Sequence, residues 1–399
     1  MISKKTAREN KMADDVTRSI NACAAHYGEQ SGAMRDYLTQ GQARAHQLSN
    51  RGPLKFDKNG DLDAGIRAAY SKYGFYIFEG AIGPKELAEL EHDIKATRSK
   101  FPLQPDGQID AQGNPALGTD CKAPTVQWAK PLSDPLGGSA LYNARHQVKL
   151  FEPKANIDAP AYLPLVLMGQ LQFSEACLRL YGHPQLLKVA EAIHGEDFAP
   201  FNEVIFFKDA GLGAAVSWHQ DGDTHWDNPS FDEDIHGFNF MAQIYSSTAV
   251  NGVWVIPGSH REGKLNIKAK MEQAGSERLP GAVPMACIPG DVIISNRQLV
   301  HGSFANTGFE PRLTVNFGFH RRSSVLNVQG AGMHSKSVIY DEEHIKKRSY
   351  AIGLAIDARR QHFRGEEPYH YKPLSDEGIK WTEGSLSKLK DYNLLDLSI

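Results

Sequence analysis

The pattern of apolar and polar positions is most informative between residue 202 and about residue 322. Short apolar runs alternate there with turn residues such as Pro289-Gly290-Asp291, a pattern typical of a β-rich jelly roll or barrel. The expected strands cover residues 204–207, 238–245, 253–256, 292–294 and 312–320. Asn251-Gly252 predicts a hairpin turn, because both residue types tolerate positive φ.

The last expected strand has two contrasting faces. Its apolar side chains occupy alternate positions, namely Leu313, Val315, Phe317 and Phe319. Side chains alternate between the faces of a strand, so the other face carries Arg312, Thr314, Asn316, Gly318 and His320. The apolar face suits packing under helices. The polar face predicts a barrel whose lumen holds a charged ligand instead of a packed core.

Helical patterns flank the β-rich region, which makes the fold class α+β. They cover residues 1–50, 61–73 closed by Gly74, 84–100 opened by Pro84, 173–181, the stretch after Pro184, 342–363 and 385–395, with a buried strand at 75–78. We therefore expect a helical N-terminal extension (1–52), a β-rich domain (53–330) and a helical C-terminal extension (331–399). The first extension either docks or frays, and the last is expected to pack on the core.

Residues 102–160 are rich in Gly, Pro, Asp and Gln and show no convincing periodicity. A long irregular segment inside a compact domain is often a lid or a binding loop. The side chains in it that could reach a ligand are Tyr142, Arg145, His146 and Lys149. The favoured alternative is that these are ordinary side chains of a surface loop.

Composition excludes several classes of protein. Lys and Arg number 44 and Asp and Glu number 47, so the chain lacks the charge excess of nucleic-acid or membrane-surface proteins. The four cysteines are scattered without a CxxC pair, which fits a reducing compartment. The N-terminus has no apolar signal-peptide core, and no run approaches the ~18 apolar residues of a membrane span. A soluble, cytoplasmic protein is expected, with no nucleic-acid or membrane partner.

The strongest chemical signal is the pair His219 and Asp221. Two residues apart on a strand, their side chains point to the same face. With the distant His301 they have the composition of a two-histidine, one-carboxylate facial triad, which leaves three coordination positions open at a non-haem Fe(II). A His-x-Asp tripeptide is by itself a weak signal, since about one is expected by chance.

Other short motifs are less convincing. His225 with Asp227 lies in an expected loop, and His194 with Glu196 lies at an expected helix end. The segment 211–216 lacks the third glycine of a nucleotide-binding motif and precedes a strand instead of a helix.

The residues after His301 strengthen the metal hypothesis. Ser303 lies two positions further, so its hydroxyl shares the face of His301. Arg312 offers a planar two-donor fork that suits a carboxylate better than lysine does. Taken singly, His301 could be a buried structural histidine and Arg312 a surface ion pair. Together these groups predict a site for Fe(II) and a dicarboxylic acid.

The same stretches resemble the phytanoyl-CoA dioxygenase family. They are Trp218-His219-Gln220-Asp221, Asn251-Gly252 through Pro257-Gly258-Ser259-His260, Pro289-Gly290-Asp291, and His301-Gly302-Ser303 through Arg312, within residues 65–322. The interval from His301 to Arg312 is similar to that family's. The resemblance implies a double-stranded β-helix, a jelly-roll or cupin-like barrel, that uses Fe(II), 2-oxoglutarate and O2.

The resemblance also implies residue roles. His219, Asp221 and His301 match the iron ligands, Arg312 and Ser303 match the residues that hold the distal carboxylate of 2-oxoglutarate, and Lys208 matches a second cosubstrate contact. Met241 stands where some relatives have Trp. The cosubstrate contact that this Trp makes in those relatives is therefore in doubt for this chain. Halogenating members of the wider superfamily replace the acid with Ala or Gly, so Asp221 argues against halogenation.

The implied reaction oxidises, most simply hydroxylates, a C–H bond of a small organic molecule while 2-oxoglutarate and O2 become succinate and CO2. A non-catalytic sensor and a metal-dependent isomerase or hydrolase are the alternatives. Residues expected near the substrate are Gln243, Tyr245 and Asn316 in the lumen and Trp226, His225, His320 and Arg321 at its rim. A homodimer through the terminal extensions is a further expectation.

Overall fold

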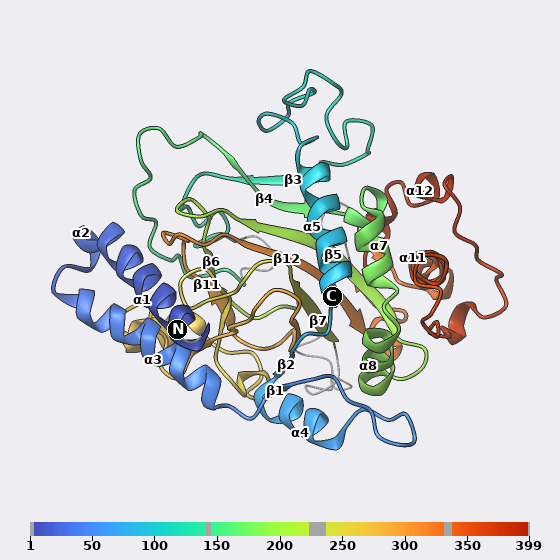
Figure 1. Ribbon diagram of the computed structural model, residues 1–399, viewed down its shortest axis with the longest axis horizontal. Helices are drawn as coiled ribbons and strands as arrows, with labels where there is room; N and C mark the ends of the chain where they lie inside the picture. Colours follow the sequence, from blue (N-terminus) through green and yellow to red (C-terminus); the bar gives the residue numbers. More distant parts are fainter. Residues whose placement is uncertain (1–3, 141–144, 223–236, 331–336, 398–399) are drawn as a thin grey trace.

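The computed structural model describes residues 4–140, 145–222, 237–330 and 337–397, and two β-sheets form its centre (Figure 1). The larger sheet has the strand order β1 (Arg51–Gly52), β2 (Phe75–Phe78), β10 (Val292–Asn296), β7 (Gly237–Gln243), β12 (Arg312–His320), β5 (Ala199–Lys208), β4 (Leu163–Met168), β3 (Val126–Ala129). The smaller sheet has the order β6 (Val216–His219), β11 (His301–Ser303), β8 (Trp254–Val255), β9 (Val283–Pro284). A short hairpin, β13 (Gln329–Gly330) and β14 (Val338–Ile339), lies outside both sheets.

Helices surround the sheets. Around the larger sheet lie α4 (Ala64–Tyr73), α5 (Pro84–Arg98), α7 (Glu175–Tyr181), α8 (Pro184–His194) and α11 (Glu342–His362). The remaining α-helices of the described chain are α1 (Lys4–Ala22), α2 (Ala24–Tyr27), α3 (Ser31–Gln47), α9 (Ile267–Ala274), α10 (Arg322–Val325) and α12 (Ser385–Lys388). Local signals set the ends of α4: the Asp63 carboxylate accepts from the backbone N–H groups of Gly65 and Ile66, and Gly74 closes the helix at φ 80°.

Strand β12 is central in the larger sheet and pairs antiparallel with β5 and β7. The register places Arg312 opposite Lys208 on β5 and Asn316 opposite Met241 on β7. Residues that lie opposite each other project from the same face, so the polar face predicted for β12 continues onto its neighbours.

The two sides of the larger sheet face different surroundings. On one side, Val315 and Phe317 of β12 belong to the main apolar core, which α5, α7, α8 and α11 complete. On the other side, Met241 of β7 packs in a second core with Val255 and Val283 of the smaller sheet. The two sheets therefore pack face to face, and the two-faced character of β12 is confirmed.

The N-terminal helices pack on the smaller sheet, at the opposite end of the molecule from α11 and α12 (Figure 1). The ring of Tyr37 on α3 stacks on Trp254 of β8 with 4.7 Å between centroids. The Ser19 and Thr307 hydroxyls share a hydrogen bond of 2.8 Å. Gly41 allows this approach, because a Cβ there would lie 2.3 Å from the Trp254 ring. Docking of this segment is therefore observed.

The C-terminal segment packs against the outer side of the larger sheet through α11. Arg348 on α11 pairs with Glu203 of β5 at 2.5 Å and with Asp396 at 3.3 Å, and both pairs are buried. The helix expected at 342–363 is confirmed. The single helix expected at 385–395 is wrong: it splits into α12 and the 3-10 turn η5 (Tyr392–Leu395), because Asp391 takes a left-handed φ of 60° between them.

The hairpin expected at Asn251-Gly252 is wrong. The strands on either side, β7 and β8, belong to different sheets, and neither turn residue has positive φ. The Asn251 side chain instead accepts from the Thr248 backbone N–H at 2.9 Å and donates to the Glu310 carbonyl at 3.0 Å. Gly252 is required for close packing, since a Cβ would lie 2.4 Å from the Thr248 carbonyl oxygen.

The irregular stretch 102–160 also departs from a plain loop. It contributes β3 to the edge of the larger sheet, where β3 pairs with β4.

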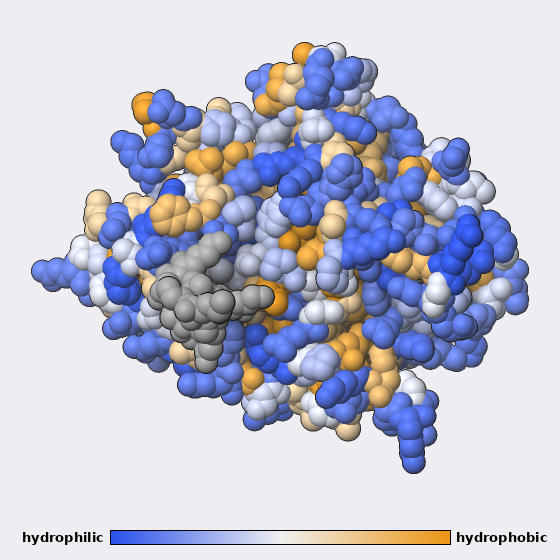
Figure 2. All heavy atoms as spheres, in the orientation of Figure 1, coloured by the Kyte–Doolittle hydropathy of each residue, from blue (hydrophilic) through white to orange (hydrophobic). Residues whose placement is uncertain are grey.

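One face of the molecule is mostly hydrophilic, with small, scattered apolar areas (Figure 2). Among the described residues, no helix combines the length and the apolar character that crossing a membrane requires.

Candidate metal centre

Two neighbouring strands of the smaller sheet bring two histidines together. Strand β6 is antiparallel to β11, and His219 lies directly opposite His301. The backbone N–H of Asp221 donates to the Arg297 carbonyl at 2.9 Å, which fixes the chain just beyond β6. One ligand atom from each of His219, Asp221 and His301 lies within 4.8 Å of the others. The structure therefore brings the three predicted residues into one cluster.

Backbone carbonyls fix the tautomers of both rings. His219 Nδ1 lies 2.7 Å from the Ser217 carbonyl oxygen, and His301 Nδ1 lies 2.8 Å from that of Leu299. A carbonyl only accepts, so each Nδ1 carries the proton and each Nε2 keeps its lone pair. His219 Nε2 is 3.6 Å from Asp221 Oδ1, and His301 Nε2 is 3.9 Å from Asp221 Oδ2. Three donor atoms thus face one small volume.

The protonation states suit a divalent metal. Burial, with His219 nearby, lowers the pKa of His301 to about 4. Burial alone would raise the pKa of Asp221, but its interaction with His219 and the positive charges around it hold that pKa well below the usual value. At neutral pH the cluster therefore offers a neutral imidazole and an ionised carboxylate, the forms that bind metals.

Two buried cations lie next to this cluster. Lys208 Nζ donates to the hydroxyl of Ser303 on β11, and Arg312 is opposite Lys208 in the sheet. Burial and the neighbouring Arg312 hold the pKa of Lys208 well below its usual value, and burial lowers the pKa of Arg312 to about 10. Asp134 offsets only part of the effect on Lys208, and within the described chain Arg312 Nε and Nη1 are buried without a hydrogen-bond partner.

The sequence matches the family "Phytanoyl-CoA dioxygenase (PhyH)" over residues 70–314, more than half of its length. This chain belongs to the phytanoyl-CoA dioxygenase family. That family depends on Fe(II) and 2-oxoglutarate.

The residues present fit both groups of the family. Two imidazoles and one carboxylate on one face are the ligand set that non-haem Fe(II) prefers. Among the described residues, two buried nitrogens of Arg312 have no partner and are donors that a carboxylate would satisfy, and Lys208 Nζ is a further buried donor beside Ser303. A dicarboxylic acid beside the metal would therefore pair with the buried guanidinium of Arg312.

The comparison with solved structures gives matches at low identity. EctD from S. alaskensis, with 2-oxoglutarate and 5-hydroxyectoine, is 20% identical, with a TM-score of 0.47, and the match covers 70% of this chain and 84% of that one. AviO1 from Streptomyces viridochromogenes Tue57 is 16% identical, with a TM-score of 0.44, and the match covers 65% and 95%. The non-heme alpha ketoglutarate dependent epimerase SnoN from nogalamycin biosynthesis is 16% identical, with a TM-score of 0.40, and the match covers 70% and 81%. No curated protein matches the chain.

The polar face of the larger sheet carries two of the predicted substrate residues. Gln243 is buried; its Oε1 accepts from the Thr314 hydroxyl at 3.1 Å and its Nε2 donates to the Met241 carbonyl at 3.3 Å. Asn316 Oδ1 is buried without a partner in the described chain. Asn316 therefore retains an acceptor for a ligand, whereas Gln243 is already engaged with its own sheet.

The prediction for Tyr245 is wrong. Its hydroxyl donates to Glu91 of α5 at 3.0 Å, on the helical side of the larger sheet. The backbone N–H groups of Ile244 and Tyr245 both donate to the Leu313 carbonyl, at 2.9 and 3.2 Å. This irregularity ends β7 at Gln243 and breaks the alternation that the prediction extended.

The residues predicted at the rim of the lumen differ in their burial. Arg321 is half-buried directly after β12, whereas His320 is fully buried and shares a hydrogen bond of 3.3 Å with Arg297 Nη1. Trp226, His225 and Asp227 lie outside the described residues. His194 of the other rival pair stacks on Phe238 at 4.8 Å between ring centroids, in the core beneath the helices. That pair is therefore remote from the metal centre.

Sequence reasoning undervalued two residues of the irregular stretch 102–160. His146 is 1% exposed, and its ring lies 4.2 Å from that of His219 between centroids. Arg145 Nη1 lies 3.6 Å from Asp221 Oδ1. Lys149 is half exposed and pairs with Glu152 at 3.1 Å, as expected of a surface loop. Tyr142 lies outside the described residues.

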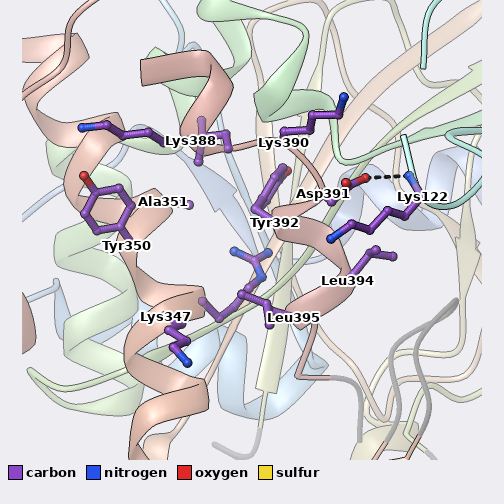
Figure 3. A pocket seen from close by; sticks show the side chains of 12 residues that line it. Lys122, Lys347, Tyr350, Ala351, Lys388, Lys390, Asp391, Tyr392, Leu394 and Leu395 are labelled. Carbon is purple, nitrogen blue, oxygen red and sulfur yellow. Dashed lines mark hydrogen bonds between the residues drawn. The ribbon is translucent and has the colours of Figure 1, made fainter. Parts of the chain in front are cut away.

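A separate pocket of about 290 Å³ lies among the C-terminal helices, and its labelled side chains include four lysines around Tyr392 and Leu395 (Figure 3). Two of these lysines are paired, Lys347 with Glu343 at 2.6 Å and Lys390 with Asp120. The residues that line the pocket include none of the metal centre. The chemistry and this pocket therefore occupy different parts of the molecule.

Proposed function

We propose that this chain is an Fe(II)- and 2-oxoglutarate-dependent oxygenase that hydroxylates a C–H bond of a small organic molecule. One observation carries the proposal: the His219–Asp221–His301 cluster stands beside the buried side chains of Lys208 and Arg312, and in the described part of the chain two of the Arg312 nitrogens have no hydrogen-bond partner. Family membership over residues 70–314 supports it. We include in the proposal that the two facing sheets form a double-stranded β-helix within residues 53–330, with helical extensions at 1–52 and 331–399.

His219, Asp221 and His301 would hold the iron. Arg312 would bind the distal carboxylate of 2-oxoglutarate, with Ser303 and Lys208 as further donors. Bound iron with 2-oxoglutarate supplies O2-dependent oxidation of a C–H bond, coupled to the formation of succinate and CO2. The chain's own share is to keep both Nε2 atoms deprotonated, to orient the acid, and to exclude water through the apolar contacts of Met241 with Val255.

Two described residues that the sequence predicts near the substrate could recognise a small molecule. Asn316 offers an unpartnered acceptor on the polar face, and Arg321, at the end of β12, is the described charged residue predicted at the rim. Cytoplasmic location and a homodimer through the terminal extensions stay predictions. SnoN is described as an epimerase, so the test must report on turnover of 2-oxoglutarate as well as on binding.

The test compares wild type with His219→Ala under anaerobic conditions. Iron(II) plus 2-oxoglutarate should give a visible metal-to-ligand charge-transfer band in wild type and none in His219→Ala, because chelation of the ligand requires the iron. His370→Ala, at an exposed position, is the matched control and should keep the band. No band in iron-loaded wild type would contradict the proposal. A band without succinate from any substrate in a metabolite panel would favour a sensor, and turnover that survives Arg312→Ala would favour an isomerase or hydrolase.

A further inference from the structure

Residues 130–140 and 145–152, the described parts of one segment between β3 and β4, lie near β6, the edge strand that carries His219. The Leu132 backbone N–H donates to the Leu212 carbonyl at 2.8 Å, and that of Ala215 donates to the Ser133 carbonyl at 2.7 Å. These two hydrogen bonds attach the segment to the chain immediately before β6. The segment therefore lies next to the exposed edge of the smaller sheet.

A single buried aspartate holds the two ends of this segment together. Asp134 Oδ1 accepts from the Gly137 backbone N–H at 3.0 Å, and Oδ2 accepts from that of Leu150 at 2.9 Å. The Asp134 N–H donates to Glu152 Oε1 at 2.8 Å. Asp134 thus ties Gly137 to Leu150, and the described residues 145 and 146 lie next to the metal centre.

His146 packs against His219, one of the three candidate metal ligands. Its Nδ1 lies 3.0 Å from the Ser217 hydroxyl, and its ring lies at 34° to that of His219. Ser217 also provides the carbonyl that fixes the His219 tautomer. His146 and the Ser217 carbonyl therefore constrain the plane and the direction of one imidazole together.

Arg145 contacts the carboxylate ligand. Asp221 Oδ1 lies 3.6 Å both from Arg145 Nη1 and from His219 Nε2, whereas Oδ2 is directed towards His301 at 3.9 Å. The pair is partly shielded, because the side chains of Arg145 and Asp221 are 22% and 16% exposed. A guanidinium beside one oxygen restrains rotation of the carboxylate and distinguishes its two oxygens.

We propose that Arg145 and His146 are positioning residues of the metal centre: His146 fixes the ring of His219, and Arg145 holds Asp221 by one oxygen. This inference rests on the proposed function, since it assigns the supports of the same metal ligands. The described residues of this segment, 130–140 and 145–152, then form a wall of the site, and the sequence between β3 and β4 contributes to metal affinity. Removal of groups that orient metal ligands lowers metal affinity by about 10- to 100-fold, and we expect this size of effect.

The experiment measures Co(II) binding to the metal-free, full-length protein by calorimetry and by visible absorption, without 2-oxoglutarate. His146→Ala and Arg145→Met should each weaken Co(II) binding about 10- to 100-fold and change the ligand-field bands. Lys149→Met is the matched control, because it removes a positive charge from the same loop at an exposed position, and its affinity should equal that of wild type. If His146→Ala does not fold, Ser217→Ala removes the hydroxyl partner alone and should weaken binding several-fold.

Wild-type affinity and bands in either His146→Ala or Arg145→Met would overturn the assignment for that residue. Unchanged Co(II) binding by Arg145→Met together with weaker 2-oxoglutarate binding to the metal-loaded protein would also overturn it, because Arg145 would then contact the ligand. His219→Ala separates this failure from failure of the proposed function. If wild type binds no Co(II), or His219→Ala binds it equally well, the metal centre itself is wrong; if only the supporting variants behave as wild type, the inference alone is wrong.

Discussion

Buried arginines on the two sides of the larger sheet differ in whether a carboxylate pairs with them. On the helical side, Arg348 pairs with Glu203 at 2.5 Å, and Arg359 pairs with Glu86 at 2.5 Å and Glu366 at 2.6 Å. On the side facing the smaller sheet, Arg312 is just as buried, but no described carboxylate pairs with it. A buried charge is costly unless it is paired, so the unpaired one indicates where a ligand completes the site.

The pKa values follow the same division. Burial is the largest single influence on Arg348 and disfavours its charge, yet Glu203, Asp396 and two tyrosines together outweigh burial and raise its pKa well above the usual value. For Arg312 burial acts without compensation and lowers the pKa to about 10. The helical side therefore pairs its buried arginine within the chain. On the other side, under the proposed function, an anionic ligand would pair with Arg312.

The largest expected effect comes from removing a paired arginine. Arg348→Met should lower the free energy of unfolding by about 3–5 kcal/mol, because it leaves the buried carboxylates of Glu203 and Asp396 without their partner. Urea unfolding followed by circular dichroism measures it. Arg312→Met serves as the comparison and should leave stability unchanged or slightly raised, since it strands no acid. Equal losses in the two variants would abolish the distinction between the sides.

A smaller effect is expected on 2-oxoglutarate binding when Arg312, the arginine without a described acidic partner, is replaced. Hydrogen bonds to a charged group contribute about 1.5–3 kcal/mol, so Arg312→Met should weaken 2-oxoglutarate binding by roughly 10- to 150-fold. Equilibrium binding to the metal-loaded protein measures it, with Co(II) affinity as the internal control, which should stay unchanged. Arg312→Lys should recover only part of the loss, because an ammonium lacks the planar two-donor fork. Wild-type binding by Arg312→Met would show that the acid lies elsewhere.

Much of this division was predictable from the sequence. The period-2 alternation from Arg312 to His320 predicted both faces of β12, and the continuous pairing with β7 preserves that alternation from Thr314 to His320. The spacing of His219, Asp221 and His301 predicted a cluster that the antiparallel pairing of β6 and β11 then assembled. These predictions succeeded because one element, or two paired elements, determines them.

Features that depend on distant contacts were not predictable. Arg145 and His146 lie in a stretch without periodicity, and Asp134 ties Gly137 to Leu150 on either side of them. Tyr245 moved to the helical side because two backbone N–H groups share the Leu313 carbonyl. Asn251-Gly252 failed as a hairpin because the chain crosses there from one sheet to the other. In each case a partner far along the chain overrides the local pattern.

The smallest effect concerns His183, an exception on the helical side, because the charged group that acts on it is the cation of Arg359. Burial and Arg359 lower its pKa to about 3, from 6.5 when it is exposed. Between these values the unfolded chain binds a proton that the folded chain does not, so lowering the pH from 6 to 5 should cost about 1.4 kcal/mol per pH unit from this group. His183→Gln should remove that part of the slope, as measured by urea unfolding at each pH, whereas His370→Ala, at an exposed position, should retain it. An unchanged slope in His183→Gln would mean that His183 is protonated in the folded chain and that the helical side tolerates an unpaired cation after all.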